Sequence, residues 1–315
     1  MRSLLYAGLT ALLALSICAC GDSRVEAVSG TPTRTIALPS GGELNVPERA
    51  LRILPMSAAS VDFVLALVPR DRVAAVPEAA ATYACSLQGE RSWPADRTIK
   101  DFAAEAMLAA SPDLVIAHAW QTPIEALEIV EASGIPVLRL GDVNSMDDLY
   151  STIQLIASAL DEPRAGAHLV ADLQRRVDLL RAGAPERGRL RALSYTNFGS
   201  GGFSAGRGTT ADILIQLTGM ANAGADDGRR DHYEIDIERL LQLDPDVIVV
   251  SRSTQEYSAS RGYLDNEDAL ESLHAIERGW IVELPASLFS TNSQYLVDTA
   301  ERLARDVDAL LEAPR

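Results

Sequence analysis

The sequence predicts an α/β fold of two similar lobes with mainly parallel sheets, joined by a long backbone helix and with a ligand cleft between the lobes. Three observations support this prediction. Short apolar segments alternate with amphipathic stretches, one β-α pattern occurs twice, and residues 145–183 between the two copies have helical periodicity. Such alternation is typical of parallel sheets covered by helices.

Residues 1–19 read as a signal peptide, with Arg2 followed by an almost wholly apolar run over residues 4–17. A run of this length is too short for a stable membrane span. The small Ala19 before Cys20 is similar to a bacterial lipobox and predicts a lipidated Cys20, and an ordinary signal peptide is the alternative. Residues 20–33 are then the lipidated cysteine and a small, polar, flexible tether.

The composition limits the class of protein. After signal removal Cys85 is the only cysteine besides Cys20, so no internal disulfide is expected and the fold depends on its core. The processed chain has 27 basic and 44 acidic residues. A chain this acidic is a poor binder of nucleic acid.

The internal repeat consists of EAMLAASPDLVI at residues 105–116 and ERLLQLDPDVIV at residues 238–249. In each copy an amphipathic helix is expected to open near the glutamate. Pro112 or Pro245 ends that helix, because proline cannot continue it. The apolar run that follows predicts a strand buried on both faces of a parallel sheet.

The flanks of the two copies correspond as well. Each copy is preceded by a strand, a loop and a helix, and is followed by a helix and another strand. In the first copy these are residues 51–57, 60–68, 122–133 and 135–140, and in the second they are 190–197, 209–219, 266–278 and 280–284. The sequence thus predicts two equivalent α/β units.

The segment between the repeats predicts two helices, over residues 146–160 and from Pro163 to about Arg181, with proline at the first helical position. The resulting division is an N-terminal lobe at 34–144, linking helices at 145–183 and a C-terminal lobe at 184–315. A cleft between lobes, beyond the carboxyl ends of parallel strands, is the usual ligand site.

These segments together resemble the helical-backbone class of ABC-transporter solute-binding proteins. The resemblance covers about residues 33–312 and includes residues 49–76, the two Glu…Pro-Asp units and GTTADILIQLTGMANAG at 208–224. Residues 33–50 resemble the hairpin that precedes the first lobe in ferric-siderophore binders. The resemblance implies a non-enzymatic, monomeric receptor without a cofactor, which captures cobalamin, a ferric siderophore or haem and delivers it to a membrane permease.

Two glutamates are implied by this resemblance to contact the permease. A surface glutamate on each lobe pairs with permease arginines in the family, and the corresponding residues here are Glu105 and Glu238. The alternative is that each glutamate only stabilises the first turn of its helix through the helix dipole.

The motif GFSAG at residues 202–206 raises a different possibility, a serine esterase with Ser204, Asp246 and His274 as its triad. The surrounding sequence argues against it. Ser204 is expected in the middle of a loop rather than at a strand-to-helix turn, and Asp246 is explained by the repeat. The glycines are expected to let this loop approach a ligand closely before a helix capped by Thr209 or Thr210.

The candidate ligand contacts follow the predicted strands. Aromatic residues are only 5% of the chain, yet several gather at these positions, where they could stack on a flat chelate, and arginines there would suit carboxylates. Ordinary loop packing is the alternative for each. The candidates are Met56, Ser57, Tyr83, Trp93, His118, Trp120, Tyr195, Asn197, Phe198, Phe203, Arg207, Ser251, Arg252, Tyr257 and Phe289.

The family resemblance implies Tyr83 as a candidate axial ligand, because some haem binders ligate iron through a tyrosine at roughly this place. His118 is the other candidate, because imidazole is a ligand for iron and cobalt. A free Zn or Mn ion is disfavoured, because His168 and His274 fall on predicted helices and leave too few ligands near a cleft. Cys85 is expected to be a buried thiol.

The sequence therefore predicts a lipid-anchored receptor of an ABC importer for an iron or cobalt chelate. Three alternatives remain: a Zn or Mn receptor of the same fold, a serine esterase, and a sensing receptor without a permease. Cobalamin, haem and ferric siderophores all fit the composition of the cleft.

Overall fold

The computed structural model describes residues 32–118, 120–184, 186–197, 199, 201–253 and 258–313. Residues from Thr33 onward form one compact unit. The predicted signal peptide and Cys20 lie outside the described residues. Within the described part of the chain, no helix has the length and apolar character needed to cross a bilayer.

The first half of the unit begins with the predicted hairpin, formed by β1 (Thr33–Ala37) and β2 (Glu43–Pro47). A parallel sheet follows in the order β3-β6-β7, from β3 (Ile53–Pro55), β6 (Leu114–His118) and β7 (Val137–Leu140). Short strands β4 (Val76–Pro77) and β5 (Thr98–Ile99) pair separately. The helices of this half are α1 (Ala58–Leu67), α2 (Ala80–Tyr83), α3 (Ala104–Ala109) and α4 (Ile124–Ala132).

The second half is built on a sheet of order β11-β9-β8-β12-β13, with β10 also paired to β8. Its strands are β8 (Arg191–Asn197), β9 (Gly202–Ala205), β10 (Ala221–Asn222), β11 (His232–Ile235), β12 (Val247–Arg252) and β13 (Ile281–Pro285). Pairing is parallel among β8, β10, β12 and β13, as predicted, whereas β9 and β11 run antiparallel.

The helices of the second half are α7 (Thr210–Leu217), α8 (Ile237–Leu243), α9 (Ala259–Asn266), α10 (His274–Glu277), α11 (Ala286–Phe289) and α12 (Tyr295–Glu312). The single helix predicted over 266–278 is wrong. The chain forms α9, which ends at Asn266, then a 3₁₀ turn and the short α10.

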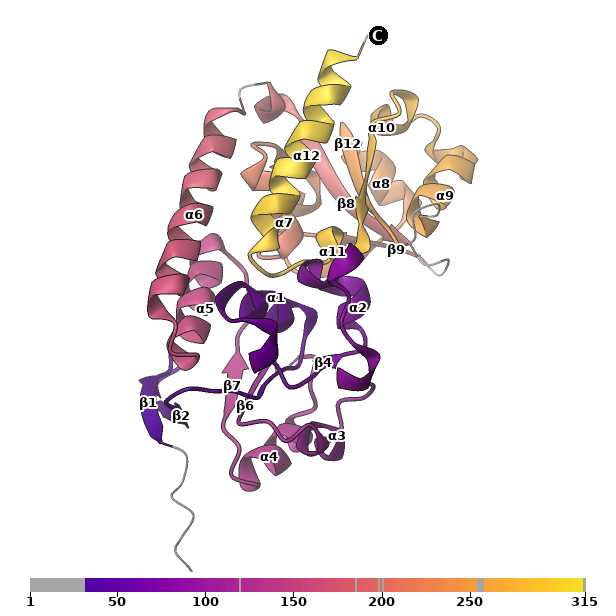
Figure 1. Ribbon diagram of the computed structural model, residues 1–315. Helices are drawn as coiled ribbons and strands as arrows, with labels where there is room; N and C mark the ends of the chain where they lie inside the picture. The colour runs from indigo at the N-terminus through magenta and orange to yellow at the C-terminus, as the bar shows by residue number, and fades with distance from the viewer. Residues whose placement is uncertain are drawn as a thin grey trace, which may run out of the picture. The chain divides into compact units, whose positions relative to one another are not determined.

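The two linking helices are present as predicted. They are α5 (Met146–Ala159) and α6 (Pro163–Ala182), with Pro163 in the first turn of α6. Figure 1 shows α6 extending along the side of the molecule from the first half to the second, where α12 lies beside it.

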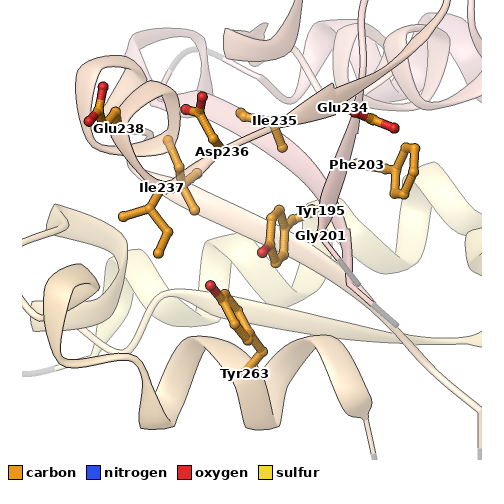
Figure 2. Close-up of a pocket in the computed structure, with 11 residues that line it drawn as sticks. Tyr195, Gly201, Phe203, Glu234, Ile235, Asp236, Ile237, Glu238 and Tyr263 are labelled. Atoms are coloured by element: carbon orange, nitrogen blue, oxygen red, sulfur yellow. The ribbon is translucent and has the colours of Figure 1, made fainter. Parts of the chain in front are cut away.

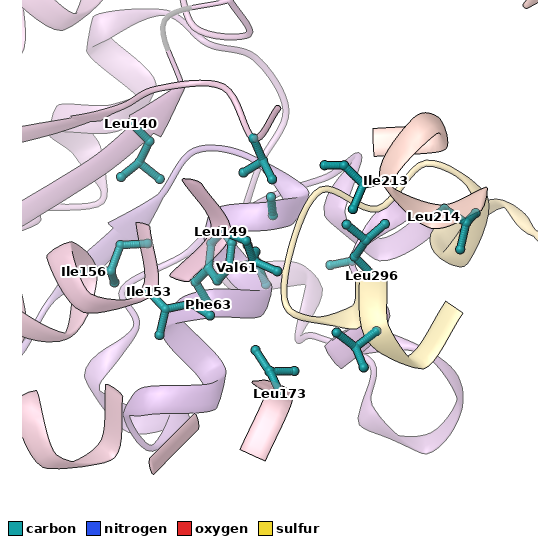
Figure 3. Close-up of a cluster of buried hydrophobic side chains, with 14 of the residues drawn as sticks. Val61, Phe63, Leu140, Leu149, Ile153, Ile156, Leu173, Ile213, Leu214 and Leu296 are labelled. Atoms are coloured by element: carbon teal, nitrogen blue, oxygen red, sulfur yellow. The ribbon is translucent and has the colours of Figure 1, made fainter. Parts of the chain in front are cut away.

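One apolar core continues through both halves (Figure 3). Phe63 of α1 packs in the same cluster as Ile153 of α5 and Leu173 of α6, and the cluster extends to Leu214 of α7 and Leu296 of α12. All five side chains are buried. Because the halves share this core, separating them would expose apolar surface to water.

Both copies of the repeat contain the same polar clasp. The carboxylate of Asp113 accepts hydrogen bonds from the backbone N–H groups of Leu51 (2.6 Å) and Arg52 (3.0 Å). The Arg52 side chain donates to the carbonyl oxygen of Ser111 at the end of α3.

In the second half Asp246 accepts from the backbone N–H of Arg191 (2.9 Å), whose side chain donates to the carbonyl of Leu243 (2.6 Å) at the end of α8. Each clasp joins the last turn of a helix to the start of the neighbouring strand. The Pro-Asp motif is therefore structural.

Replacing either clasp aspartate by alanine should lower the free energy of unfolding by about 1–2 kcal/mol, because charge-assisted bonds to backbone N–H groups are lost. Urea unfolding of Asp113→Ala and Asp246→Ala measures this, with Asp71→Ala at an exposed position as the control. Losses no larger than that of the control would show that the clasps contribute nothing.

Candidate functional site

A cleft lies between the two halves. One pocket of about 460 Å³ is lined by Trp120 and Val143 from the first half and by Thr209 and His232 from the second. A recess of about 210 Å³ adjoins it and shares three lining residues with it, Thr210, His232 and Ser290. We call these two connected spaces the inter-half cleft.

A further pocket of about 700 Å³ also lies between the halves. It is lined by Thr82 and Gln88 from the first half and by Arg252, Ala286 and Ser287 from the second. Arg252 therefore lies where the two halves face each other, and its contact with a ligand stays a prediction.

The recess is lined by one face of the second sheet. Side chains alternate between the two faces of a strand. Thr196 of β8 pairs with Phe203 of β9, and Ala205 pairs with His232 of β11, and all four residues line the recess. Phe289, at the end of α11, lines it as well.

Tyr195 and Asn197 lie on the opposite face, so placing them among the cleft contacts was wrong. Both are buried, and the Asn197 side-chain amide donates to the Tyr195 hydroxyl at 3.0 Å. The backbone N–H of Asn197 also donates to Ser260.

In the first half Trp120 is 61% exposed and lines the cleft, whereas His118 is fully buried. The two rings lie 5.7 Å apart between centroids. The Nδ1 atom of His118 lies 2.9 Å from the hydroxyl of Ser57, and Nε2 has no partner among the described residues. Burial lowers the pKa of His118 to about 4. The structure therefore places His118 in the core and not among ligand-facing side chains.

Three other predicted contacts also have structural roles. Ser57 caps α1, and Met56 is fully buried in the core. Trp93 lies between the guanidinium groups of Arg70 and Arg97, at 4.7 and 4.9 Å from its ring centroid. These three placements correct the sequence prediction, which took positions after strands to be open to a ligand.

The remaining predicted contacts differ in their surroundings. Tyr83 is 45% exposed at the end of α2, outside the linings given above. Arg207 is exposed beside Gly208, which lines the cleft, and Ser251 is half-buried at the end of β12. Tyr257 and Phe198 lie outside the described residues.

The sequence prediction missed His232 and the hydroxyl residues Ser194, Thr196 and Ser290 of the recess. A signal for two of them exists. Ser194 and Thr196 alternate with Leu193 and Tyr195 in β8, and such alternation predicts one polar face.

The GFSAG segment is a strand, which corrects the predicted loop. Gly199 and Gly201 have positive φ angles of 92° and 132°, and β9 pairs antiparallel with β8 directly after them. Glycine tolerates these angles, so the glycines turn the chain back on itself. The predicted cap at Thr209 is present, since its side chain accepts from the backbone N–H of Asp212.

The triad is not assembled. Ser204 is buried opposite Tyr195, and its hydroxyl has no partner among the described residues. Asp246 is held in its clasp, and His274 pairs with Asp244 at 2.7 Å. Ser204 therefore has neither the base nor the acid of an esterase.

Asp62 joins the two halves through buried hydrogen bonds. Its carboxylate accepts hydrogen bonds from the backbone of Cys85 (3.2 Å) and Ser86 (2.8 Å) in the first half and from the hydroxyl of Ser293 (2.9 Å) in the second. The Asp62 carbonyl accepts from Gln294 at 2.8 Å. Burial raises the pKa of the Asp62 carboxyl, and the hydrogen bonds from Ser86, Ser293 and Cys85 lower it.

The Cys85 thiol is buried, as predicted, and donates to the carbonyl oxygen of Ser287 at 3.2 Å. Burial, followed by the charge of Asp62, raises its pKa to about 12.

Over the described residues, no three His, Cys, Asp or Glu side chains come together as a metal site.

Residues 56–288 match the family described as periplasmic binding protein, so the chain belongs to that family. Membership makes it a binding protein and not an enzyme.

Two curated relatives illustrate the range of this similarity. The uncharacterized ABC transporter substrate-binding lipoprotein YvrC of Bacillus subtilis is 20% identical over 212 residues. The match covers 64% of this chain and 64% of YvrC, so the chain spans just under two thirds of the length of that relative. The vitamin B12-binding protein of Yersinia pseudotuberculosis is 24% identical over 271 residues, 82% of this chain and 85% of the relative.

Solved structures share the two-lobed α/β fold. The periplasmic haem-binding protein HutB of Vibrio cholerae matches with a TM-score of 0.71 at 21% identity, over 84% of this chain and 100% of that one. An ABC-type Fe3+-hydroxamate transport protein of Saccharomonospora viridis matches with a TM-score of 0.68 at 24% identity, over 87% and 98%.

Acid should destabilise the protein partly through His118. Its pKa is about 4 in the folded protein, against 6.5 for a histidine side chain free in water, so the unfolded chain takes up the proton first as pH falls. The stability from neutral His118 is present above pH 6.5 and is lost between about pH 6.5 and 4, by up to about 3 kcal/mol.

Urea unfolding of the wild type and His118→Gln between pH 4 and 7 measures this contribution. The variant should show the smaller dependence on pH in that window. If the free energy of unfolding of the two proteins falls equally between pH 7 and 4, His118 is not a buried neutral imidazole in the folded protein.

Proposed function

We propose that the protein is the substrate-binding component of an ABC importer and captures an iron or cobalt chelate in the inter-half cleft. The observation that carries the proposal is the cleft itself, in which an exposed tryptophan and an exposed histidine from different halves line one pocket. Relatives named for vitamin B12, haem and Fe3+-hydroxamate support this class of ligand.

Trp120 supplies the stacking surface in this proposal. A large aromatic side chain exposed to water is suited to a flat or bulky ligand, because stacking buries apolar area on both partners. Phe203 and Phe289 extend the apolar surface into the recess, and hydroxyl groups there can bond to polar substituents of the ligand.

His232 is the residue we propose to reach the metal of the chelate. Its side chain is exposed and lines both parts of the cleft, and neutral imidazole is a ligand for iron and cobalt. This assignment replaces His118, whose ring is shut inside the core, and Tyr83, which lies outside the cleft lining.

Trp120→Ala and His232→Ala should each weaken chelate binding about tenfold or more, or about 1.4 kcal/mol. Tryptophan fluorescence and chelate absorbance during titration with cyanocobalamin, haemin and ferric hydroxamates measure the affinity. The His232 variant should also lose any change in the absorption spectrum that metal coordination causes.

The matched control is His274→Ala, which removes an exposed histidine paired with Asp244 in α10. It should bind like the wild type. If no chelate binds to the wild type, or if all three variants bind equally well, the proposed cleft function is wrong.

Delivery to the permease is proposed to use Glu105 and Glu238. Both are exposed, in the first turns of α3 and α8, the equivalent helices of the internal repeat. Two carboxylates in equivalent places suit a partner with two related subunits. Charged pairs at an interface contribute mainly to its specificity and rate of association.

The double variant Glu105→Ala/Glu238→Ala should bind the chelate normally but lower its uptake at least tenfold when reconstituted with the permease in proteoliposomes. Glu125→Ala/Glu271→Ala removes two other glutamates and serves as the control. Normal uptake by the first variant would contradict docking through these residues, whereas no uptake with the wild-type protein would favour the sensing alternative.

The chain is further proposed to be a monomer that acts outside the cytoplasm, held at a membrane by a lipidated Cys20 after removal of residues 1–19. The lipobox-like junction and the naming of YvrC as a lipoprotein support this location. The division into lobes at 34–144 and 184–315 with linking helices at 145–183 is part of the same proposal.

A further inference from the structure

A second hollow lies within the second half and shares one lining residue, Phe203, with the recess of the inter-half cleft. It has a volume of about 700 Å³ and is formed where β9 begins, β11 ends and α8 starts, with α9 on its other side (Figure 2). We call it the α8 hollow. Its lining includes the aromatic and acidic residues Tyr195, Phe203, Glu234, Asp236, Glu238 and Tyr263.

Aromatic rings from three elements form part of its wall. Tyr195 of β8 and Tyr263 of α9 lie 6.4 Å apart between ring centroids, and their hydroxyl groups are turned toward one another in Figure 2. Phe203 of β9 is 38% exposed beside Glu234. Exposed aromatic faces attract cations through their negative π surface.

Carboxylates form the other part of the wall. Glu234, Asp236 and Glu238 are all exposed, and among the described residues no Lys or Arg side chain lines the hollow. Asp236 uses one oxygen to cap α8 by accepting from the backbone N–H of Arg239. The hollow thus combines negative charge with aromatic surface.

Glu267 adds to this negative potential. Burial and then the charge of Glu267 raise the pKa of Tyr263, and Glu267 also contributes to the raised pKa of Tyr195, for which burial is again the main cause. Both phenols therefore stay protonated and neutral at physiological pH. Tyr195 is buried and its hydroxyl accepts from Asn197, so Tyr263 supplies the ring that a cation can reach.

The equivalent place in the first half is different. The hollow ahead of α3 is smaller, about 270 Å³, and is lined by Glu78, Lys100, Asp101 and Phe102. Its described lining includes a cationic side chain and no tyrosine. The repeated architecture therefore produces a hollow in both halves, but of these two the α8 hollow has the chemistry of a cation site.

We propose that the α8 hollow binds a small organic cation, with an ammonium or guanidinium group between the Tyr263 ring and the carboxylates. The aromatic wall favours a poorly hydrated organic cation over Na⁺ or Ca²⁺, which prefer oxygen ligands alone. This proposal does not rest on chelate binding, although Phe203 lines both the hollow and the recess of the inter-half cleft.

Calorimetric titration of the protein at low salt with choline and with arginine tests the proposal. 3,3-Dimethyl-1-butanol, the uncharged analogue of choline, is the comparison ligand. Choline, arginine or both should bind in the millimolar range, more weakly as NaCl is raised, whereas the uncharged analogue should not bind measurably.

The variants use residues that are not part of the proposed permease contact. Tyr263→Leu should weaken cation binding about 3–10-fold, while Tyr263→Phe, which keeps the ring, should retain most of it. Glu234→Gln should weaken it about 2–5-fold. Glu78→Gln, in the smaller hollow ahead of α3, is the matched control and should leave the affinity for the cation unchanged.

Two results would overturn the proposal. One is no binding of either cation to the wild type, or equal binding of the uncharged analogue. The other is cation binding that Tyr263→Leu and Glu234→Gln leave unchanged in folded protein, as judged by circular dichroism. Chelate titration of Tyr263→Leu should match the wild type, because Tyr263 does not line the inter-half cleft.

Discussion

The buried carboxylate of Asp62 is the interaction on which the relation between the two halves depends. A carboxylate in an apolar interior costs much free energy unless donors surround it. Here the donors come from Cys85 and Ser86 in one half and from Ser293 in the other. Moving the halves apart would remove the hydrogen bond from Ser293 to this carboxylate and the bond from Gln294 to the Asp62 carbonyl, so the contact resists separation.

Other contacts in the structure add to the connection that Asp62 makes between the halves. The apolar core passes from α1 through α5 and α6 to α7 and α12, and the Arg–Asp clasps fix the strands to the helices within each half. A frame of this kind predicts small adjustments rather than a wide hinge closure. Ligand selection then depends on the side chains already facing the cleft, such as Trp120 and His232.

Much of the fold was predictable because it depends on local patterns that occur twice. The Pro-Asp units, the helix start at Pro163 and the cap at Thr209 all follow from backbone chemistry, which a sequence shows directly. The antiparallel strand β9 was missed, because its glycines are equally compatible with an open loop.

The site was predicted less well, for a physical reason. Position after a strand does not decide which way a side chain points, and Tyr195 and His118 turned into the core while His232 faced the cleft.

A crystal structure with the tightest-binding chelate would decide between a rigid, preformed cleft and a hinged one. We predict the chelate between Trp120 and His232 with the Asp62–Ser293 bond intact. A chelate bound elsewhere, or halves rotated with that bond broken, would contradict the rigid cleft.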